Sequence, residues 1–199
     1  MKKLFTLISL VSILIFTGCS KTPEKEEKIT VKESEVIKIK DINSGAEYTL
    51  KRKNGGFVVE GHEDKALMFD MYATYCPPCR KEAPHLTELQ VKYAEKFLII
   101  ALNTFEEVTD TYINDNFRFK YGAYYFITNS KDNQKIIDTI LKDIDYKRMI
   151  QIPFKVVSKD GKYQTLTDIY NARNVDNKYY IGAIESKVIE KDLKGILEK

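Results

Sequence analysis

Cysteine is scarce in this sequence of 199 residues, which has three cysteines, five prolines and no tryptophan. A protein that disulfides stabilise normally spreads an even number of cysteines through its loops. Here Cys76 and Cys79 are separated by only two residues, so a bond between them closes a very short loop and adds little stability. We therefore expect this pair to serve chemistry rather than stability.

The chain also lacks a strong net charge of either sign, because its 32 basic residues are nearly balanced by 29 acidic residues and the net charge is +3. Removal of residues 1–18 would take away Lys2 and Lys3 and no acidic residue, which leaves a net charge of +1. Basic and acidic side chains are interleaved along the chain, so no basic patch indicates a nucleic-acid partner. We expect none.

The longest apolar run lies at the beginning of the chain. Lys2 and Lys3 precede residues 4–16, which are fewer than the roughly 20 apolar residues of a membrane-spanning helix. Basic residues followed by a short apolar run are typical of a bacterial export signal. We predict a signal peptide over residues 1–18.

The end of this segment, Thr17-Gly18-Cys19, resembles the lipobox of bacterial lipoproteins, in which the cysteine is lipidated and becomes the first residue. Phe16 stands where the lipobox usually has leucine. An ordinary cleaved signal, or an uncleaved anchor with an incidental cysteine, is the alternative. We expect a lipid on Cys19 and a disordered, highly charged tether over residues 19–35. The protein would then be a bacterial lipoprotein, membrane-anchored on the extracytoplasmic (periplasmic) side.

From residue 36 to residue 199 the pattern is that of a single folded domain. Alternating apolar residues at 36–40 and turn residues at 43–45 and 54–56 predict a small β-hairpin region. Farther along the chain, the periodicity predicts helices and strands in alternation. The helices are expected around 108–117, 136–144 and 189–197, and the strands around 124–127, 154–157, 163–166 and 179–182.

Between these regions, nearly continuous apolar runs at 66–72 and 97–102 are typical of buried parallel strands. A helical stretch connects them, and Cys76 and Cys79 lie where the first strand passes into this helix. A strand, a helix and a second strand in succession form a βαβ unit. The sequence therefore predicts an α/β domain with its cysteine pair at a strand-to-helix junction.

A Cys-x-x-Cys motif at the start of a helix has the spacing that thiol–disulfide exchange requires. The helix N-terminus favours the thiolate of the first cysteine, so Cys76 is the expected nucleophile and Cys79, one turn later, the resolving cysteine. The alternative is half of a zinc site, which needs four ligands. The rest of the chain offers only His62 and His85, so we predict no metal and no other cofactor.

The stretch Phe-Asp-Met-Tyr-Ala-Thr-Tyr-Cys-Pro-Pro-Cys-Arg-Lys-Glu-Ala-Pro at 69–84 resembles a common sequence of the thioredoxin superfamily. The resemblance is to its membrane-anchored branch, the TlpA- and ResA-like thioredoxins of cytochrome c maturation. Tyr72 and Tyr75 stand where tryptophans are usual in that branch. The resemblance implies a thioredoxin fold, with a central mixed β-sheet flanked by helices and an N-terminal β-hairpin extension.

Two prolines extend the resemblance. Pro84 falls where this family kinks its first helix, and Pro153, ahead of a strand and an Asp160-Gly161 turn, resembles the cis-proline loop of the family. A trans proline that begins a strand is the alternative. In the family, the backbone beside this proline binds an extended polypeptide. The residues expected to contact the substrate are Tyr75, Pro77, Pro78 and Ile152.

Asp70 lies within an otherwise apolar strand, where an ionised carboxylate without a partner is costly. The resemblance implies a buried proton relay that deprotonates Cys79, although many anchored relatives have asparagine at this position. An aspartate at the strand end that faces water is the alternative. Arg80, Lys81 and Glu82 are expected on the solvated face of the helix.

These features predict an extracytoplasmic thiol–disulfide oxidoreductase, a monomer that reduces disulfides of exported proteins. The resemblance adds apocytochrome c as a client and a transmembrane electron-donor protein as a partner. Two alternatives are open: an oxidase or isomerase that introduces or shuffles disulfides, and a redox-inert interaction module. Oxidases of the superfamily commonly carry a histidine inside the Cys-x-x-Cys motif, and copper-delivering relatives space their cysteines by three; neither feature occurs here.

Overall fold

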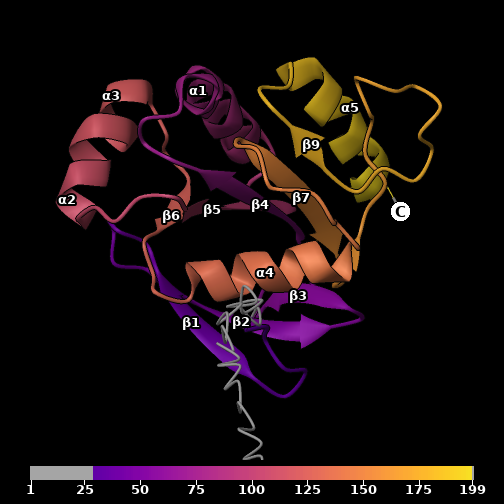
Figure 1. Ribbon diagram of the computed structural model, residues 1–199, viewed down its shortest axis with the longest axis horizontal. Helices are drawn as coiled ribbons and strands as arrows, with labels where there is room; N and C mark the ends of the chain where they lie inside the picture. Colours follow the sequence, from indigo (N-terminus) through magenta and orange to yellow (C-terminus); the bar gives the residue numbers. More distant parts are fainter. Residues whose placement is uncertain (1–28, 199) are drawn as a thin grey trace, which may run out of the picture.

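The computed structural model of the chain describes residues 29–198 (Figure 1). The predicted signal peptide and Cys19 therefore lie outside the described residues. Within 29–198, no helix is both long enough and apolar enough to cross a membrane.

A mixed sheet of six strands forms the centre of the molecule, in the order β6-β5-β4-β7-β8 with β9 also paired to β7. Its strands are β4 (Ala66–Tyr72), β5 (Phe97–Asn103), β6 (Phe126–Thr128), β7 (Phe154–Lys159), β8 (Lys162–Tyr163) and β9 (Tyr180–Ile181). Strands β4, β5 and β6 are parallel, whereas β7 runs antiparallel to β4. Every residue of β4 and β5 is buried, as their unbroken apolar runs predicted.

Helices cover both faces of this sheet (Figure 1). They are α1 (Pro77–Lys92), α2 (Asp110–Ile113), the π-helical turn η1 (Asn114–Arg118), α3 (Phe119–Tyr121), α4 (Asn133–Asp143) and α5 (Ser186–Leu197). Helices α1 and α5 pack into one apolar core together with α2 and η1. Helix α4 packs into a second core on the opposite face. The helix expected around 108–117 is thus a continuous helical run that contains a π-helical turn.

The predicted N-terminal β-hairpin region is an antiparallel sheet of three strands. Its strands are β1 (Val36–Lys40), β2 (Glu47–Lys53) and β3 (Gly56–Val59), and their apolar side chains join the core beneath α4. The chain is packed against α4 even before the predicted domain boundary at residue 36. Val31 is buried, and its backbone N–H donates to Thr139 Oγ1 at 2.8 Å.

One buried carboxylate connects this extension to the central sheet. Asp41 Oδ2 accepts hydrogen bonds from Arg118 Nη2 at 2.5 Å and from the Ile127 N–H of β6 at 2.9 Å. Its Oδ1 accepts from the N–H and the hydroxyl of Ser44. Burial alone would raise the pKa of Asp41, but these hydrogen bonds and the Arg118 charge hold it below its ordinary value.

We expect Asp41→Ala to lower the free energy of unfolding by about 3–5 kcal/mol at neutral pH, because it leaves the Arg118 guanidinium buried without its partner. Because the folded pKa is depressed, this contribution is present above the unfolded carboxyl pKa and is lost as the pH falls through the folded pKa. Urea unfolding at neutral and acid pH measures both effects. Asp176→Ala, which breaks an ion pair whose carboxylate is 82% exposed, is the control and should cost less than about 1 kcal/mol. Equal costs for the two variants would contradict this role.

Candidate active site

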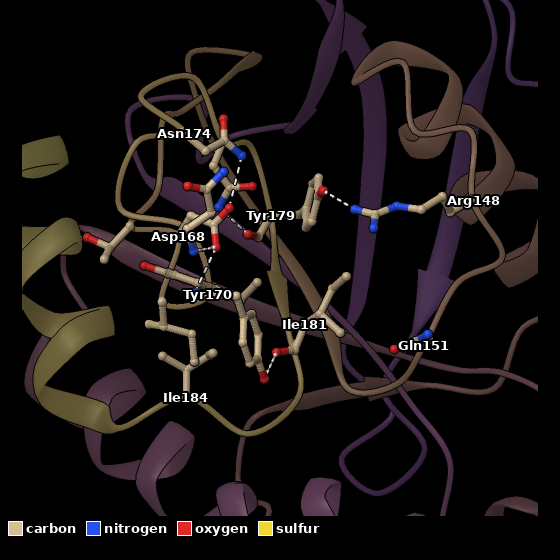
Figure 2. Close-up of a pocket in the computed structure, with 13 residues that line it drawn as sticks. Arg148, Gln151, Asp168, Tyr170, Asn174, Tyr179, Ile181 and Ile184 are labelled. Carbon is tan, nitrogen blue, oxygen red and sulfur yellow. Dashed lines mark hydrogen bonds between the residues drawn. The ribbon is translucent and has the colours of Figure 1, made fainter.

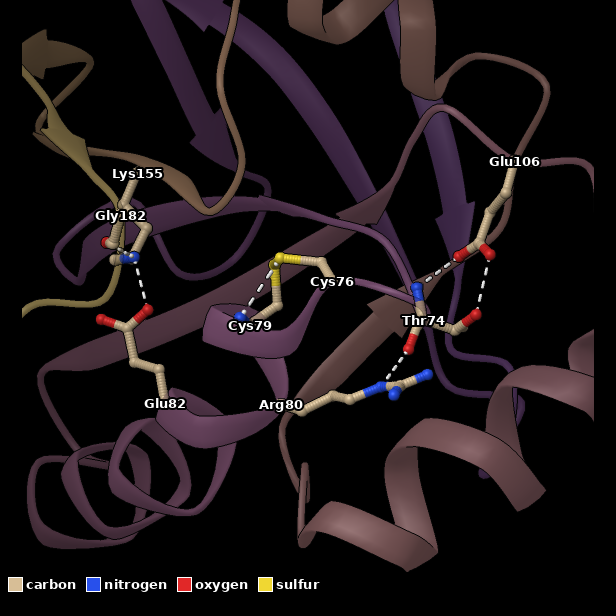
Figure 3. Close-up of a disulfide and its surroundings, with 8 residues drawn as sticks. All are labelled: Thr74, Cys76, Cys79, Arg80, Glu82, Glu106, Lys155 and Gly182. Atoms are coloured by element: carbon tan, nitrogen blue, oxygen red, sulfur yellow. Dashed lines mark hydrogen bonds and ion pairs between the residues drawn. A yellow bond between two sulfur atoms is a disulfide. The ribbon is translucent and has the colours of Figure 1, made fainter.

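Cys76 and Cys79 lie at the junction between the carboxyl end of β4 and the first turn of α1 (Figure 3). Cys76 is the N-cap residue of α1, and its Sγ accepts a hydrogen bond from the Cys79 N–H at 3.3 Å. Pro77 and Pro78 occupy the first two helical positions, where a missing N–H costs nothing. The two sulfur atoms form a disulfide of 2.11 Å, and both cysteines are buried. The strand-to-helix placement expected from the sequence is therefore present.

The loop before β7 lies beside this junction. The Ile152–Pro153 peptide bond is cis. Phe154 pairs with Met71 near the end of β4, so the residue pair before Phe154 reaches the same edge of the sheet as the segment that leads to Cys76. Ile152 packs against the apolar core that contains both cysteines. The structure thus brings the cis-proline loop, expected from the resemblance, to the disulfide.

The residues expected to contact substrate differ in their exposure. Tyr75 is 54% exposed, and Pro77 is also exposed. Pro78 and Ile152 are half-buried. Apolar surface around the disulfide is therefore accessible to a polypeptide, although the disulfide itself is covered.

Glu106 holds the segment that leads to Cys76. Its carboxylate accepts from the Thr74 N–H at 2.5 Å and from Thr74 Oγ1 at 2.7 Å (Figure 3). The Thr74 carbonyl accepts from Arg80 Nε at 2.6 Å, and the Arg80 guanidinium lies 5.2 Å from the centre of the Tyr121 ring. These bonds fix the loop from both sides. Nothing in the sequence indicated Glu106, because 32 residues separate it from its partner.

Asp70 is buried in β4, a central strand of the sheet, where it pairs with Ala101 of β5 on one side and Lys155 of β7 on the other. This position excludes the alternative of a strand-end aspartate that faces water. Among residues 29–198, its Oδ1 has no hydrogen-bond partner. Burial raises the pKa of Asp70 to about 7; the Lys155 charge opposes this rise and the Glu82 charge adds to it. Asp70 can therefore exchange a proton near neutral pH.

The prediction that Glu82 lies on the solvated face of the helix is wrong. Glu82 is 3% exposed, and its Oε2 accepts from Lys155 Nζ at 2.6 Å. Lys155 Nζ also donates to the Gly182 carbonyl at 3.3 Å (Figure 3). Glu82 Oε1 accepts from the Ile184 N–H at 3.0 Å. The reason is helical geometry, since Glu82 follows Cys79 by three residues and shares its inward face.

Lys155 is a site residue that the apolar pattern of residues 154–157 did not indicate, because that pattern predicted only a strand. It is fully buried, and it stands within the apolar strand of residues 154–157. A lysine in such a run was the available signal, because a buried lysine requires a counter-charge. In the part of the chain that the structure describes, no cluster of histidine, cysteine and acidic residues could hold a metal ion.

Comparisons with known proteins agree with this geometry. The Thioredoxin family model matches residues 49–140. The thiol-disulfide oxidoreductase ResA of Bacillus thuringiensis (strain Al Hakam) is 32% identical over 147 residues, which are 70% of this chain and 77% of that protein. The thioredoxin-like protein YneN of Bacillus subtilis (strain 168) is 27% identical over 106 residues, or 52% of this chain and 57% of that protein.

Among solved structures, StoA from Bacillus subtilis superposes with a TM-score of 0.52 at 16% identity, covering 79% of this chain and 95% of that one. This likeness shows the fold. The identity to ResA, over more than two thirds of both chains, shows the family. The chain therefore belongs to the thioredoxin superfamily, in its branch of ResA-like thiol–disulfide oxidoreductases.

Proposed function

We propose that the protein is a reductase, whose dithiol form donates electrons to disulfides of exported proteins on the extracytoplasmic side of the membrane. The observation that carries this proposal is Asp70, a carboxyl with a pKa of about 7 buried in the strand that leads to the cysteine pair. A base that ionises near neutrality suits the proton transfer on which release of a reduced client depends. A lipid on Cys19 would hold the protein at the membrane.

The reaction starts from the dithiol. The Cys76 thiolate attacks one sulfur of the client disulfide, forming a mixed disulfide and releasing the first client thiolate. Asp70 then accepts the proton of the Cys79 thiol. The Cys79 thiolate attacks Cys76 Sγ, which releases the second client thiolate and leaves the Cys76–Cys79 disulfide. Two electrons thus pass from the dithiol to the client, and the Asp70 proton leaves to solvent or to the released thiolate.

The neighbouring ion pair explains why no free counter-charge lowers the pKa of Asp70 to its ordinary value. Glu82 has an ammonium partner at 2.6 Å, so this pair is neutral overall when both are ionised. Ionisation of Asp70 then adds a buried negative charge without a partner of its own. Asp70 is consequently the carboxyl that stays protonated until the pH approaches 7.

The client and the electron donor follow from the same proposal. A transmembrane electron-donor protein would return the disulfide to the dithiol, because cytoplasmic reductants do not reach this side of the membrane. Apocytochrome c is the client class that we favour, since its haem-attachment motif is itself a Cys-x-x-Cys pair that must be reduced. The proline pair within the motif, in place of a histidine, supports a reductase over an oxidase.

We expect Asp70→Asn to slow resolution of the mixed disulfide on the order of a hundredfold while sparing the first attack by Cys76. Rapid-quench analysis of single turnovers separates the two steps. In the unaltered protein the resolution rate should rise as the pH increases through about 7, because the carboxylate is the base, and the variant should lack this inflection. Asp132→Asn, an exposed substitution, is the control. Unchanged resolution in Asp70→Asn would remove the proposed relay.

The two charges beside Asp70 should move this inflection in opposite directions. Lys155→Met removes the cation that lowers the pKa of Asp70, so the inflection should shift to higher pH. Glu82→Gln removes the anion that raises it, so the inflection should shift to lower pH. Each variant breaks a buried ion pair and should cost about 3–5 kcal/mol of unfolding free energy, so a folded fraction is confirmed first by circular dichroism. Shifts in the same direction would contradict the electrostatic assignment.

Trapping free thiols in intact cells tests the direction of electron flow. The reductase proposal predicts that Cys76 and Cys79 are mainly reduced at steady state, whereas a mainly oxidised pair would favour an oxidase. A Cys79→Ala variant should accumulate mixed disulfides through Cys76, and mass spectrometry of these adducts identifies the client. A Cys76→Ala, Cys79→Ala double variant is the control and should form no adduct.

A further inference from the structure

An exposed apolar patch lies along α4, and the proposed reaction does not use it. It consists of Ile29, Phe105 and Met149, whose side chains belong to residues that are 72%, 53% and 86% exposed. These three residues line one groove of about 770 Å³, to which α4 contributes a wall. Large apolar side chains that gather on a surface mark a site of contact with another protein or with a membrane.

The patch lies toward the edge of the central sheet that carries the disulfide. Phe105 follows the carboxyl end of β5, and Cys76 follows the carboxyl end of the parallel strand β4. Met149 lies in the loop that leads to Pro153 and β7, and β7 begins opposite the end of β4 because the two strands are antiparallel. A partner that covers the patch is therefore close to the cysteine pair.

The backbone holds Phe105 in its exposed position against the ordinary preference of a bulky residue. Its φ is +63°, in the left-handed region, where such a residue is an outlier. Bonds on both sides impose this conformation. The Thr104 N–H donates to the Tyr72 carbonyl at 2.9 Å, and the Glu106 carboxylate accepts from Thr74. Backbone strain of this kind clusters at functional sites, so the exposed ring is a candidate contact residue.

Basic side chains border the patch. The exposed charged residues that line the groove are Lys131, Arg148 and Asp132, so their sum is positive. Arg148 also completes the wall of a cavity of about 570 Å³, which the segment between β8 and β9 encloses, and its Nη2 donates to Tyr179 Oη at 3.0 Å (Figure 2). This bond holds the guanidinium beside the groove. Exposed cations next to apolar side chains complement the phosphates and acyl chains of an anionic bilayer.

The length of the chain before the patch favours a membrane as the partner. Residues 19–28 separate the proposed lipid on Cys19 from Ile29. A chain spans at most about 3.6 Å per residue, so Ile29 lies no more than about 36 Å from the lipid-bearing residue. The Val31 N–H is bonded to Thr139 of α4, so Ile29 lies where the chain joins the domain. The anchor therefore keeps the surface around Ile29 near the bilayer.

We propose that this patch docks the domain on the surface of an anionic phospholipid bilayer. Ile29, Phe105 and Met149 enter the boundary between headgroups and acyl chains, while Lys131 and Arg148 contact the lipid phosphates. The edge of the sheet that carries the disulfide is then held close to the membrane, where a transmembrane electron donor presents its thiols. This inference rests on the lipid anchor of the proposed function, and it adds a fixed orientation to it.

Because the chain has no tryptophan, a single introduced indole reports on one position. The full-length protein is expressed in a bacterium that attaches the lipid, and it is inserted into vesicles of equal parts phosphatidylglycerol and phosphatidylcholine. Brominated acyl chains should quench about half of the Met149→Trp emission, because interfacial side chains reach about 5–10 Å into the headgroup and acyl boundary. Val91→Trp is the control, at a 71% exposed position of α1, across the sheet from α4 (Figure 1), and it should keep its emission.

Further substitutions in the Met149→Trp protein assign the contact to the patch. Phe105→Asn should lower the quenching about twofold, because asparagine tolerates the left-handed backbone but brings no apolar ring. Lys131→Gln should also lower it about twofold, because it removes a cation that contacts the phosphates. Lys191→Gln, at an exposed position of α5 that does not line the groove, is the control and should leave the quenching unchanged.

The outcomes separate this inference from the proposed function. Unquenched Met149→Trp emission in the lipidated protein would overturn the docking and would leave the patch to a protein partner. Equal quenching in Val91→Trp would overturn the fixed orientation, and so would quenching that Phe105→Asn and Lys131→Gln leave intact. Mass spectrometry of the N-terminal peptide reports the lipid separately. An unmodified Cys19 would overturn the proposed anchor, and the docking with it.

Discussion

The ion pair between Lys155 and Glu82 is the interaction on which the active site depends. It is buried between β7 and α1, and the bonds from its two partners to Gly182 and Ile184 hold the segment after β9 in the same cluster. Two charges removed from water are stable only when their geometry and remaining hydrogen bonds are satisfied. The relative positions of β7, α1 and the segment after β9 are therefore set together, by this buried ion pair as much as by apolar packing.

This pair also defines the electrostatic environment of Asp70. Burial raises the pKa of Asp70 to about 7, and the Lys155 and Glu82 charges act on it in opposite directions, so neither restores its ordinary value. The same residue on an exposed strand would be ionised at neutral pH and would be a weak base. Burial thus gives Asp70 the pKa near neutrality that the proposed proton relay requires.

Polar bonds of the same kind hold the parts of the chain that surround the site. Glu106 holds Thr74 before the cysteines, and Asp41 connects the N-terminal sheet to Arg118 and to β6. In each case a carboxylate fixes a loop that apolar packing alone would leave free to shift. The scaffold around the disulfide is consequently rigid where the exchange chemistry occurs, while the exposed side chain of Tyr75 remains available for contact.

The sequence by itself determined the α/β order, the βαβ unit and the place of the cysteine pair, because burial and helix capping leave local periodic patterns. It also indicated Asp70, since an acid in an apolar strand conflicts with its surroundings. Only the tertiary structure decided that Glu82 points inward and pairs with Lys155, that Glu106 holds Thr74, and that the chain after β8 encloses a cavity. Such contacts join residues far apart in the chain, and which charge meets which depends on the packing of whole elements rather than on any local pattern.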